Sequence, residues 1–217
     1  MMRRNLLLLL LAFGLLCAVY LPAFVVAGVI RPPIEFMIPL VMAISVAMAL
    51  LLVLFLARNG PGFRAFGFNA PQWREVGFGF LLALPLALAA VGLSRLFPSK
   101  PPFDVSRFPV WMIGLYFVVA APIQEEVIFR GLIQSFLQQR WQFSSAMGAT
   151  FLSPAVVCTA ILFGLVHLDS GPAVVAGAAV LALLAGELRR FSNSLVPAIM
   201  VHALFNLTDA LWPAAQL

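Results

Sequence analysis

The stretch NLLLLLLAFGLLCAVYLPAFVVAGVI, residues 5–30, decides the fold class because it contains no charged side chain. An α-helix needs about 20 apolar residues to cross the hydrocarbon core of a bilayer. A helix also satisfies its backbone hydrogen bonds internally, which the absence of water in lipid requires. The stretch therefore predicts a membrane-spanning helix.

The composition of the whole chain follows the same pattern. Of the 217 residues, 63% are hydrophobic and 10% are charged, and the mean hydropathy is +1.06. Soluble domains carry about 25% charged residues. Lys and Arg (13) outnumber Asp and Glu (8), but they lie in loops between apolar runs, where basic residues orient membrane proteins. We therefore expect the lipid bilayer as a partner, and no nucleic acid.

Several windows have the length and apolarity of a spanning helix. They predict an all-α fold, a polytopic transmembrane helical bundle with about seven (six to eight) spanning helices. We expect a single membrane domain over residues 1–217, with N-terminal helices and interfacial loops in 1–107 and the helices that carry the polar motifs in 108–212. The windows lie near residues 5–30, 35–57, 76–97, 109–139, 150–168, 173–188 and 195–212.

The positions of the basic residues predict a cytoplasmic N-terminus. Cytoplasmic loops carry an excess of Lys and Arg, and this orientation places more of them inside than outside. The short loops are typical of a protein of the bacterial cytoplasmic membrane. The inside set is Arg3, Arg4, Arg58, Arg64, Arg74, Arg140, Arg189 and Arg190, and the outside set is Arg31, Arg95, Lys100 and Arg107.

Two polar segments are expected at the membrane surface. Residues 59–74 are too polar to span, and we expect their aromatic side chains to dip into lipid beside Arg64. Glu187 precedes two arginines at a helix end, which is typical of an interfacial anchor. The aromatic residues of the first segment are Phe63, Phe66 and Phe68.

The window 109–139 is too long for one straight span. About 31 residues rise roughly 46 Å as a helix, against a hydrocarbon core near 30 Å. We therefore expect this helix to tilt, break or project. Pro122 marks the place where a bend would free backbone carbonyls next to the charged residues that follow.

Two carboxylates and an arginine interrupt this window in AAPIQEEVIFRG, residues 120–131. Each charge costs roughly 2.5–3.5 kcal/mol at mid-membrane, so these side chains are expected to face the protein interior. Glu126 and Arg130 are four residues apart, which predicts a salt bridge on one helix face. Glu125 lies about 100° away from Glu126 around the helix, so one glutamate is left for another task.

The only two histidines of the chain also lie in apolar windows. His202 and Asn206 are four residues apart and share one helix face. At 1.5 Å per residue, Glu125, His167 and His202 lie roughly 22, 25 and 15 Å from the cytoplasmic ends of their helices. One membrane histidine alone is often a structural hydrogen bond, but similar depths on three helices predict that these side chains meet.

Such a group of carboxylates, imidazoles and an amide suits the activation of water. A glutamate can act as general base, a histidine can orient the water, and a second histidine with an asparagine can stabilise an oxyanion. Alternatively, Glu125, His167 and His202 would supply the three ligands of an open zinc site. The spacing leaves both accounts open.

The ordered motifs resemble those of a known family, the CAAX prenyl protease type II and Abi-like (CPBP) intramembrane metalloproteases. The family pattern is EExxxR, FxxxH and HxxxN or HxxxD on successive transmembrane helices. This chain has Glu125-Glu126-xxx-Arg130, Phe163-xxx-His167 and His202-xxx-Asn206, within about residues 109–212. The resemblance implies an intramembrane endopeptidase that acts on a membrane-associated protein or peptide, either a CAAX-type C-terminus or a bacterial peptide precursor.

The resemblance also implies roles for the motif residues. Glu125 would be the base and His167 its partner in positioning water, while His202 and Asn206 would donate to the oxyanion. Glu126 and Arg130 would support the site. The family name implies a metal, such as zinc, and the residue roles fit an account with or without one.

Two other classes of protein are compatible with buried Glu and His side chains. A non-catalytic membrane scaffold or immunity-type protein would keep the polar cluster for folding. A proton-coupled transporter would use the same residue types as a relay, although the chain shows no inverted repeat. Cleavage of a membrane peptide separates the protease from both alternatives.

Overall fold

The computed structural model describes residues 2–96, 108–141 and 152–211, which form helices and, within these ranges, no strand. The seven predicted helices are confirmed. Five of them are long and apolar enough to cross a membrane, whereas α7 and α9 are shorter. The helices are α1 (Met2–Ile30), α2 (Ile34–Arg58), α3 (Trp73–Leu96), one continuous helix that contains α4, α5 and α6 (Val110–Arg140), α7 (Pro154–Leu165), α8 (Pro172–Ser192) and α9 (Val196–Leu211).

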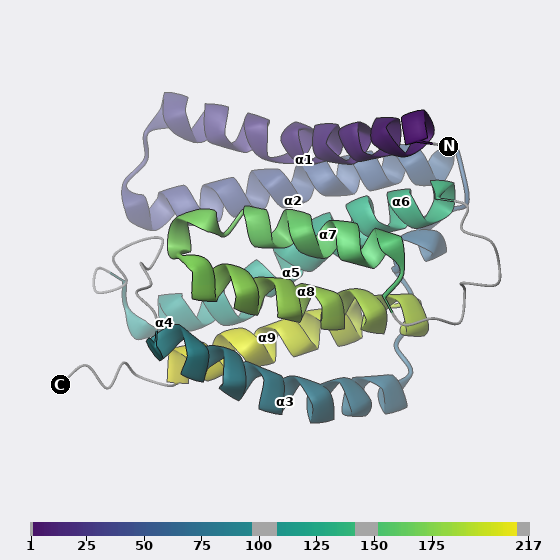
Figure 1. The fold of residues 1–217 in the computed structure, drawn as a ribbon. Coiled ribbons are helices and arrows are strands. Elements are labelled where there is room, and N and C mark those ends of the chain that lie inside the picture. Colours follow the sequence, from purple (N-terminus) through teal and green to yellow (C-terminus); the bar gives the residue numbers. More distant parts are fainter. Residues whose placement is uncertain (1, 97–107, 142–151, 212–217) are drawn as a thin grey trace.

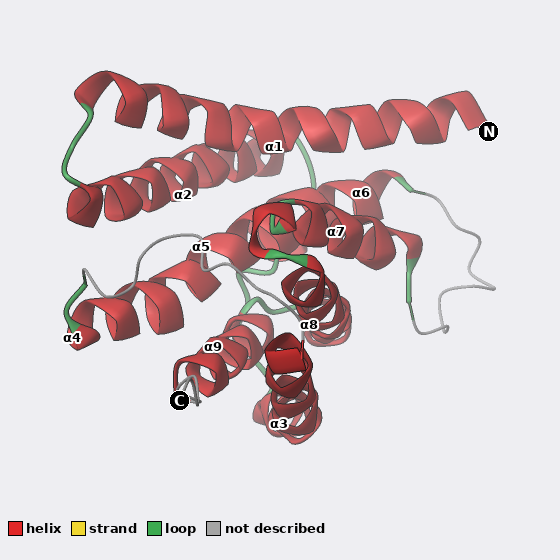
Figure 2. Cartoon of the chain, turned by 60° about the vertical axis from the view of Figure 1, so that its left-hand side comes forward, coloured by secondary structure: helices red, strands yellow, loops and turns green. Residues whose placement is uncertain are grey.

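The helices pack side by side into a bundle (Figure 1). α1 and α2 form a hairpin along one side, α3 packs on α8 and α9 at the other, and the continuous helix lies between them. Figure 2 shows the hairpin splaying away from the α4 end of that helix. The core around Ile128, Phe129 and Phe163 is fully or almost fully buried and joins the central helices to α1 and α2.

The helix Val110–Arg140 does not break at Pro122. Two π-helical stretches, Gly114–Ala120 and Val127–Gln134, alternate with the α-helical segments α4 (Val110–Ile113), α5 (Ala121–Glu126) and α6 (Ser135–Arg140). Pro122 lies in the first turn of α5, directly after the first π-helical stretch. Such π-helical segments occur frequently at functional sites, and here they flank the two glutamates.

The segment after α2 differs from its predicted place in the lipid. Phe66 is completely buried in the core, whereas Phe63 and Phe68 stay exposed. The segment is held by the α8–α9 region, because the Leu195 N–H donates to the carbonyl of Gly67 over 2.9 Å. Gly67 has a φ of +90°, and any side chain there would meet the guanidinium of buried Arg189.

Glu187 is not an interfacial anchor, because its side chain is buried. Its Oε1 accepts hydrogen bonds from the N–H groups of Leu152 and Ser153, at 3.0 and 3.1 Å, just before α7 begins. Its Oε2 pairs with Arg190 at 2.7 Å. The carboxylate therefore ties the start of α7 to the end of α8, a contact between segments about 35 residues apart.

Candidate active site

Glu126 and Arg130 form the predicted ion pair inside the bundle. Oε2 of Glu126 lies 3.0 Å from Nε of Arg130, and both side chains are completely buried. The three guanidinium nitrogens have no aligned hydrogen-bond acceptor among the described residues, and the guanidinium lies 4.9 Å from the centre of the Phe163 ring. A carboxylate and an aromatic face thus stabilise this buried cation.

His202 joins α9 to both glutamates of α5. Its Nδ1 lies 2.8 Å from Oε1 of Glu126, and its Nε2 lies 3.7 Å from Oε2 of Glu125. The carboxylate of Glu126 accepts, so Nδ1 carries the proton, and Nε2 is the nitrogen that faces Glu125. Glu125 is 21% exposed, whereas Glu126 is fully buried. The more accessible carboxylate, that of Glu125, is therefore the one nearer to Nε2 of His202.

His167 lies just beyond the end of α7 and is held by its own motif. Its Nδ1 lies 2.7 Å from the carbonyl oxygen of Phe163, which can only accept, so Nδ1 donates and Nε2 keeps a lone pair. The Phe163 ring lies 4.8 Å from the His167 ring and 5.7 Å from the His202 ring. Phe163 therefore forms a wall common to both histidines, a role that its place in the FxxxH motif did not reveal.

Asn206 follows His202 by one turn on the same face, as the sequence predicts. Its Nδ2 donates to the carbonyl oxygen of Phe117 over 2.7 Å, and Phe117 lies in the first π-helical stretch. An amide nitrogen has two N–H donors, so this bond fixes the side chain and leaves a second donor. The π-helical winding and the last helix thus position Asn206 together.

Gln124 is a buried neighbour of the glutamates that the motifs did not include. Its Nε2 donates to Oγ of Ser45 in α2 over 2.8 Å, and both side chains are buried. This bond ties the α1–α2 hairpin to the helix that carries Glu125. Two features of the sequence could have predicted this bond: Gln124 directly precedes the EExxxR motif, and Ser45 is a polar residue in an apolar helix.

The predicted zinc ligands do not form a metal site in this arrangement. Among the described residues, no group of three or more His, Cys, Asp or Glu side chains is placed to hold a metal ion. Nδ1 of His202 is engaged by Glu126 and Nδ1 of His167 by a backbone carbonyl, which leaves Nε2 as the nitrogen through which either ring could bind a metal. The zinc site predicted at Glu125, His167 and His202 stays a prediction, and the chemistry below is derived from the side chains alone.

The fold and the site define an integral membrane protein in which the buried side chains of Glu126, Arg130 and His202 lie beside the partly exposed Glu125. Residues 107–208 match the family model described as "Type II CAAX prenyl endopeptidase Rce1-like". This region carries all three motifs and is similar to that family, so the resemblance is confirmed. The family indicates an intramembrane CAAX-type endopeptidase. No curated protein and no solved structure matches the chain.

Proposed function

We propose that this protein is an intramembrane endopeptidase in which Glu125 activates water for attack on a peptide bond. The observation that carries the proposal is the position of Glu125, which is partly accessible and lies 3.7 Å from Nε2 of a buried histidine. Its neighbour Glu126 is committed to Arg130 and His202. Glu125 is therefore the carboxylate left to act on a substrate.

In the proposed reaction, Glu125 takes a proton from water as the water oxygen bonds to the carbonyl carbon. We assign His167 to the same water, because its Nε2 keeps a lone pair that can accept a hydrogen bond. When the C–N bond breaks, the proton held by Glu125 passes to the leaving amine. The products are a new carboxylate and a new amino terminus.

The oxyanion of the tetrahedral intermediate would be stabilised by His202 and Asn206. For Nε2 of His202 to donate, the ring must carry a proton on both nitrogens. Glu126 accepts the hydrogen bond from Nδ1, and Arg130 holds the Glu126 carboxylate in place. The second N–H of Asn206 supplies the other donor. This assigns support to Glu126 and Arg130, and contact with the reacting atoms to the other residues.

The substrate class follows from the location of the site. A buried site in a membrane bundle is reached by a segment that lies in the bilayer, so we assign a membrane-associated protein or peptide. A CAAX-type C-terminus and a bacterial peptide precursor are the two candidates. The protein itself is assigned to the bacterial cytoplasmic membrane with its N-terminus in the cytoplasm.

Cleavage by the purified, reconstituted protein tests this function. Products from membrane peptides of both classes would be identified by mass spectrometry, with His167→Ala and His202→Ala as variants. Thr208→Ala is the matched control on α9, since its hydroxyl donates to the Leu204 carbonyl within that helix. Loss of cleavage in both histidine variants, with the control active, is the expected result.

Wild-type protein that folds but cleaves neither class of peptide would contradict the proposal and favour the scaffold. Proton uptake coupled to solute flux would favour the transporter. Zinc is tested separately by metal analysis and chelator titration. A metal-free preparation with full activity would remove zinc, and activity restored by zinc alone would require a site that rearranges from the one described.

A further inference from the structure

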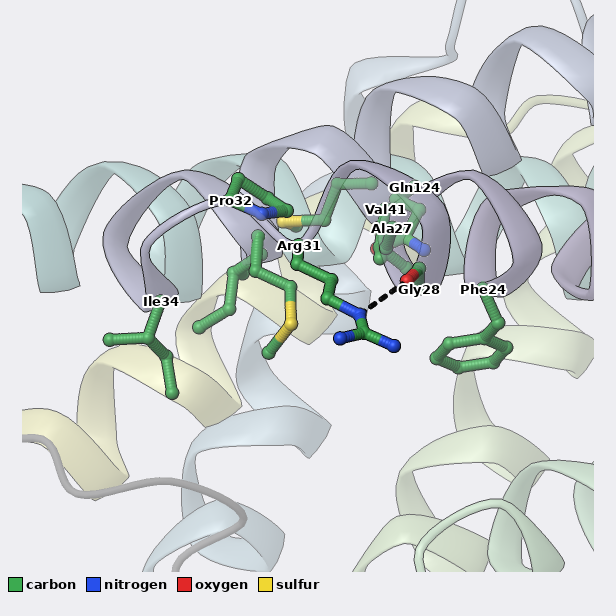
Figure 3. A pocket seen from close by; sticks show the side chains of 11 residues that line it. Phe24, Ala27, Gly28, Arg31, Pro32, Ile34, Val41 and Gln124 are labelled. Atoms are coloured by element: carbon green, nitrogen blue, oxygen red, sulfur yellow. Dashed lines mark hydrogen bonds between the residues drawn. The ribbon is translucent and has the colours of Figure 1, made fainter.

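A groove outside the proposed active site lies where the α1–α2 hairpin splays from the bundle (Figure 3). It has a volume of about 680 Å³, within the range of about 300–1,000 Å³ typical of ligand sites. Its walls are almost entirely apolar. They come from the last turns of α1, the first turns of α2 and one residue of α5, and include Phe24, Ala27, Ile34, Ile38 and Val41.

Arg31 is the one charged residue that lines this groove. Figure 3 shows its guanidinium projecting into the space between Ile34 and Phe24. Its Nε donates to the carbonyl oxygen of Gly28 over 3.2 Å, which orients the planar group but adds no counter-charge. Among the ion pairs of the described residues, none includes Arg31. An anion in the groove would find this cation available.

The backbone at Arg31 is in an unfavourable conformation for an arginine. Its φ is +48°, and its N–H donates to the carbonyl of Ala27 in the left-handed turn that ends α1. This helix-ending position favours Gly, because a Cβ costs roughly 1–2 kcal/mol there. Strain that is tolerated at a ligand-accessible cation is consistent with a binding role for its side chain.

The charged and apolar parts of the groove lie at the membrane depths of a phospholipid headgroup and acyl chain. Arg31 follows the last residue of a spanning helix, the level at which headgroups lie. Phe24 lies seven residues, or roughly 10 Å, further into the bilayer, so the apolar walls run at the depth of an acyl chain. A phosphate at Arg31 and a chain along the walls would satisfy both parts of the groove.

We infer that this groove binds one anionic phospholipid, with its phosphate on Arg31 and an acyl chain between α1 and α2. Gln124 also lines the groove and immediately precedes Glu125. The lipid would therefore fill the wedge beside the helix that carries the proposed base. This binding does not depend on the protein being a protease.

Two variants test the inference without disturbing the fold. Arg31→Gly removes the cation and relieves the left-handed backbone, so the melting temperature should stay the same or rise. Gly28→Leu fills the groove, since a Cβ at Gly28 meets nothing within 4 Å. Gly14→Leu is the matched control, because Gly14 lies in the same helix and is equally open.

Native mass spectrometry with dioleoylphosphatidylglycerol would measure the affinity, with dioleoylphosphatidylcholine and inorganic phosphate as comparison probes. We expect Arg31→Gly to weaken phosphatidylglycerol binding about fivefold, the effect of one interfacial cation, and to change phosphatidylcholine binding little. Gly28→Leu should weaken both lipids and Gly14→Leu neither. Inorganic phosphate should not compete.

Wild-type affinity in both Arg31→Gly and Gly28→Leu would overturn the inference, and so would equal losses in Gly28→Leu and Gly14→Leu. If lipid binding stayed unchanged while peptide cleavage fell, the groove would hold part of the peptide, and the lipid assignment would be wrong. Repeating the binding measurement in Glu125→Gln protein separates it from the proposed function, because lipid binding should be unaffected there.

Discussion

Replacing Glu126 by glutamine removes a negative charge from a pair in which both partners are completely buried. Oε2 of Glu126 lies 3.0 Å from Nε of Arg130, and neither side chain is exposed. The amide keeps the shape of the carboxylate but leaves the guanidinium without its counter-charge. Breaking a buried pair in this way costs about 3–5 kcal/mol, so we expect Glu126→Gln to lower the free energy of unfolding by that amount.

A double-mutant cycle with Arg130→Met isolates this interaction, measured by denaturant unfolding in detergent micelles. Each single change should be strongly destabilising, and the double change should cost less than their sum by at least about 2 kcal/mol. Glu187 and Arg190 lie 2.7 Å apart, and the Arg190 side chain is 18% exposed; this less buried pair is the control, with an expected coupling of about 0–1 kcal/mol. Additive effects at Glu126 and Arg130 would refute the assigned pairing.

Three further outcomes follow from the structure. Asn206→Ala should lower kcat about 10²–10³-fold with little change in KM, because one oxyanion donor is lost. Steady-state cleavage kinetics measure both constants. A change confined to KM would contradict the proposed role of Asn206 as an oxyanion donor. Gly67→Ala should lower the melting temperature more than Gly62→Ala, because both glycines have positive φ but Gly67 alone of the two faces a guanidinium. Equal decreases in melting temperature would show that the contact with the guanidinium does not destabilise the Gly67 variant. Ser45→Ala should cost about 1–3 kcal/mol of unfolding free energy by leaving the Gln124 amide without its acceptor, and an unchanged unfolding curve would show that this bond contributes little.

The helices could be predicted from the sequence because a helix that crosses the bilayer needs a long run of apolar residues. The Glu126–Arg130 pair and the shared face of His202 and Asn206 could also be predicted, since both depend on spacing within one helix. The meeting of α5 with α9 was predicted only from the depth count. Its geometry, in which Nδ1 of His202 faces Glu126, required the structure.

Two errors concern contacts between distant segments. Phe66 is buried because its segment is bonded to residues near 189–195, and Glu187 is buried because the start of α7 places two backbone N–H groups beside it. No local pattern encodes either partner. At Pro122 the helix continues without a break, with π-helical stretches on either side of α5.

Single-turnover cleavage of a membrane peptide by Glu125→Gln protein tests the central claim most directly, with Glu35→Gln in the first turn of α2 as the matched control. A general base contributes about 10²–10⁴-fold to a reaction rate. We predict a loss of that size in Glu125→Gln, unchanged unfolding, and wild-type rates in the control. Full activity in folded Glu125→Gln protein would contradict the assignment of Glu125 as the base.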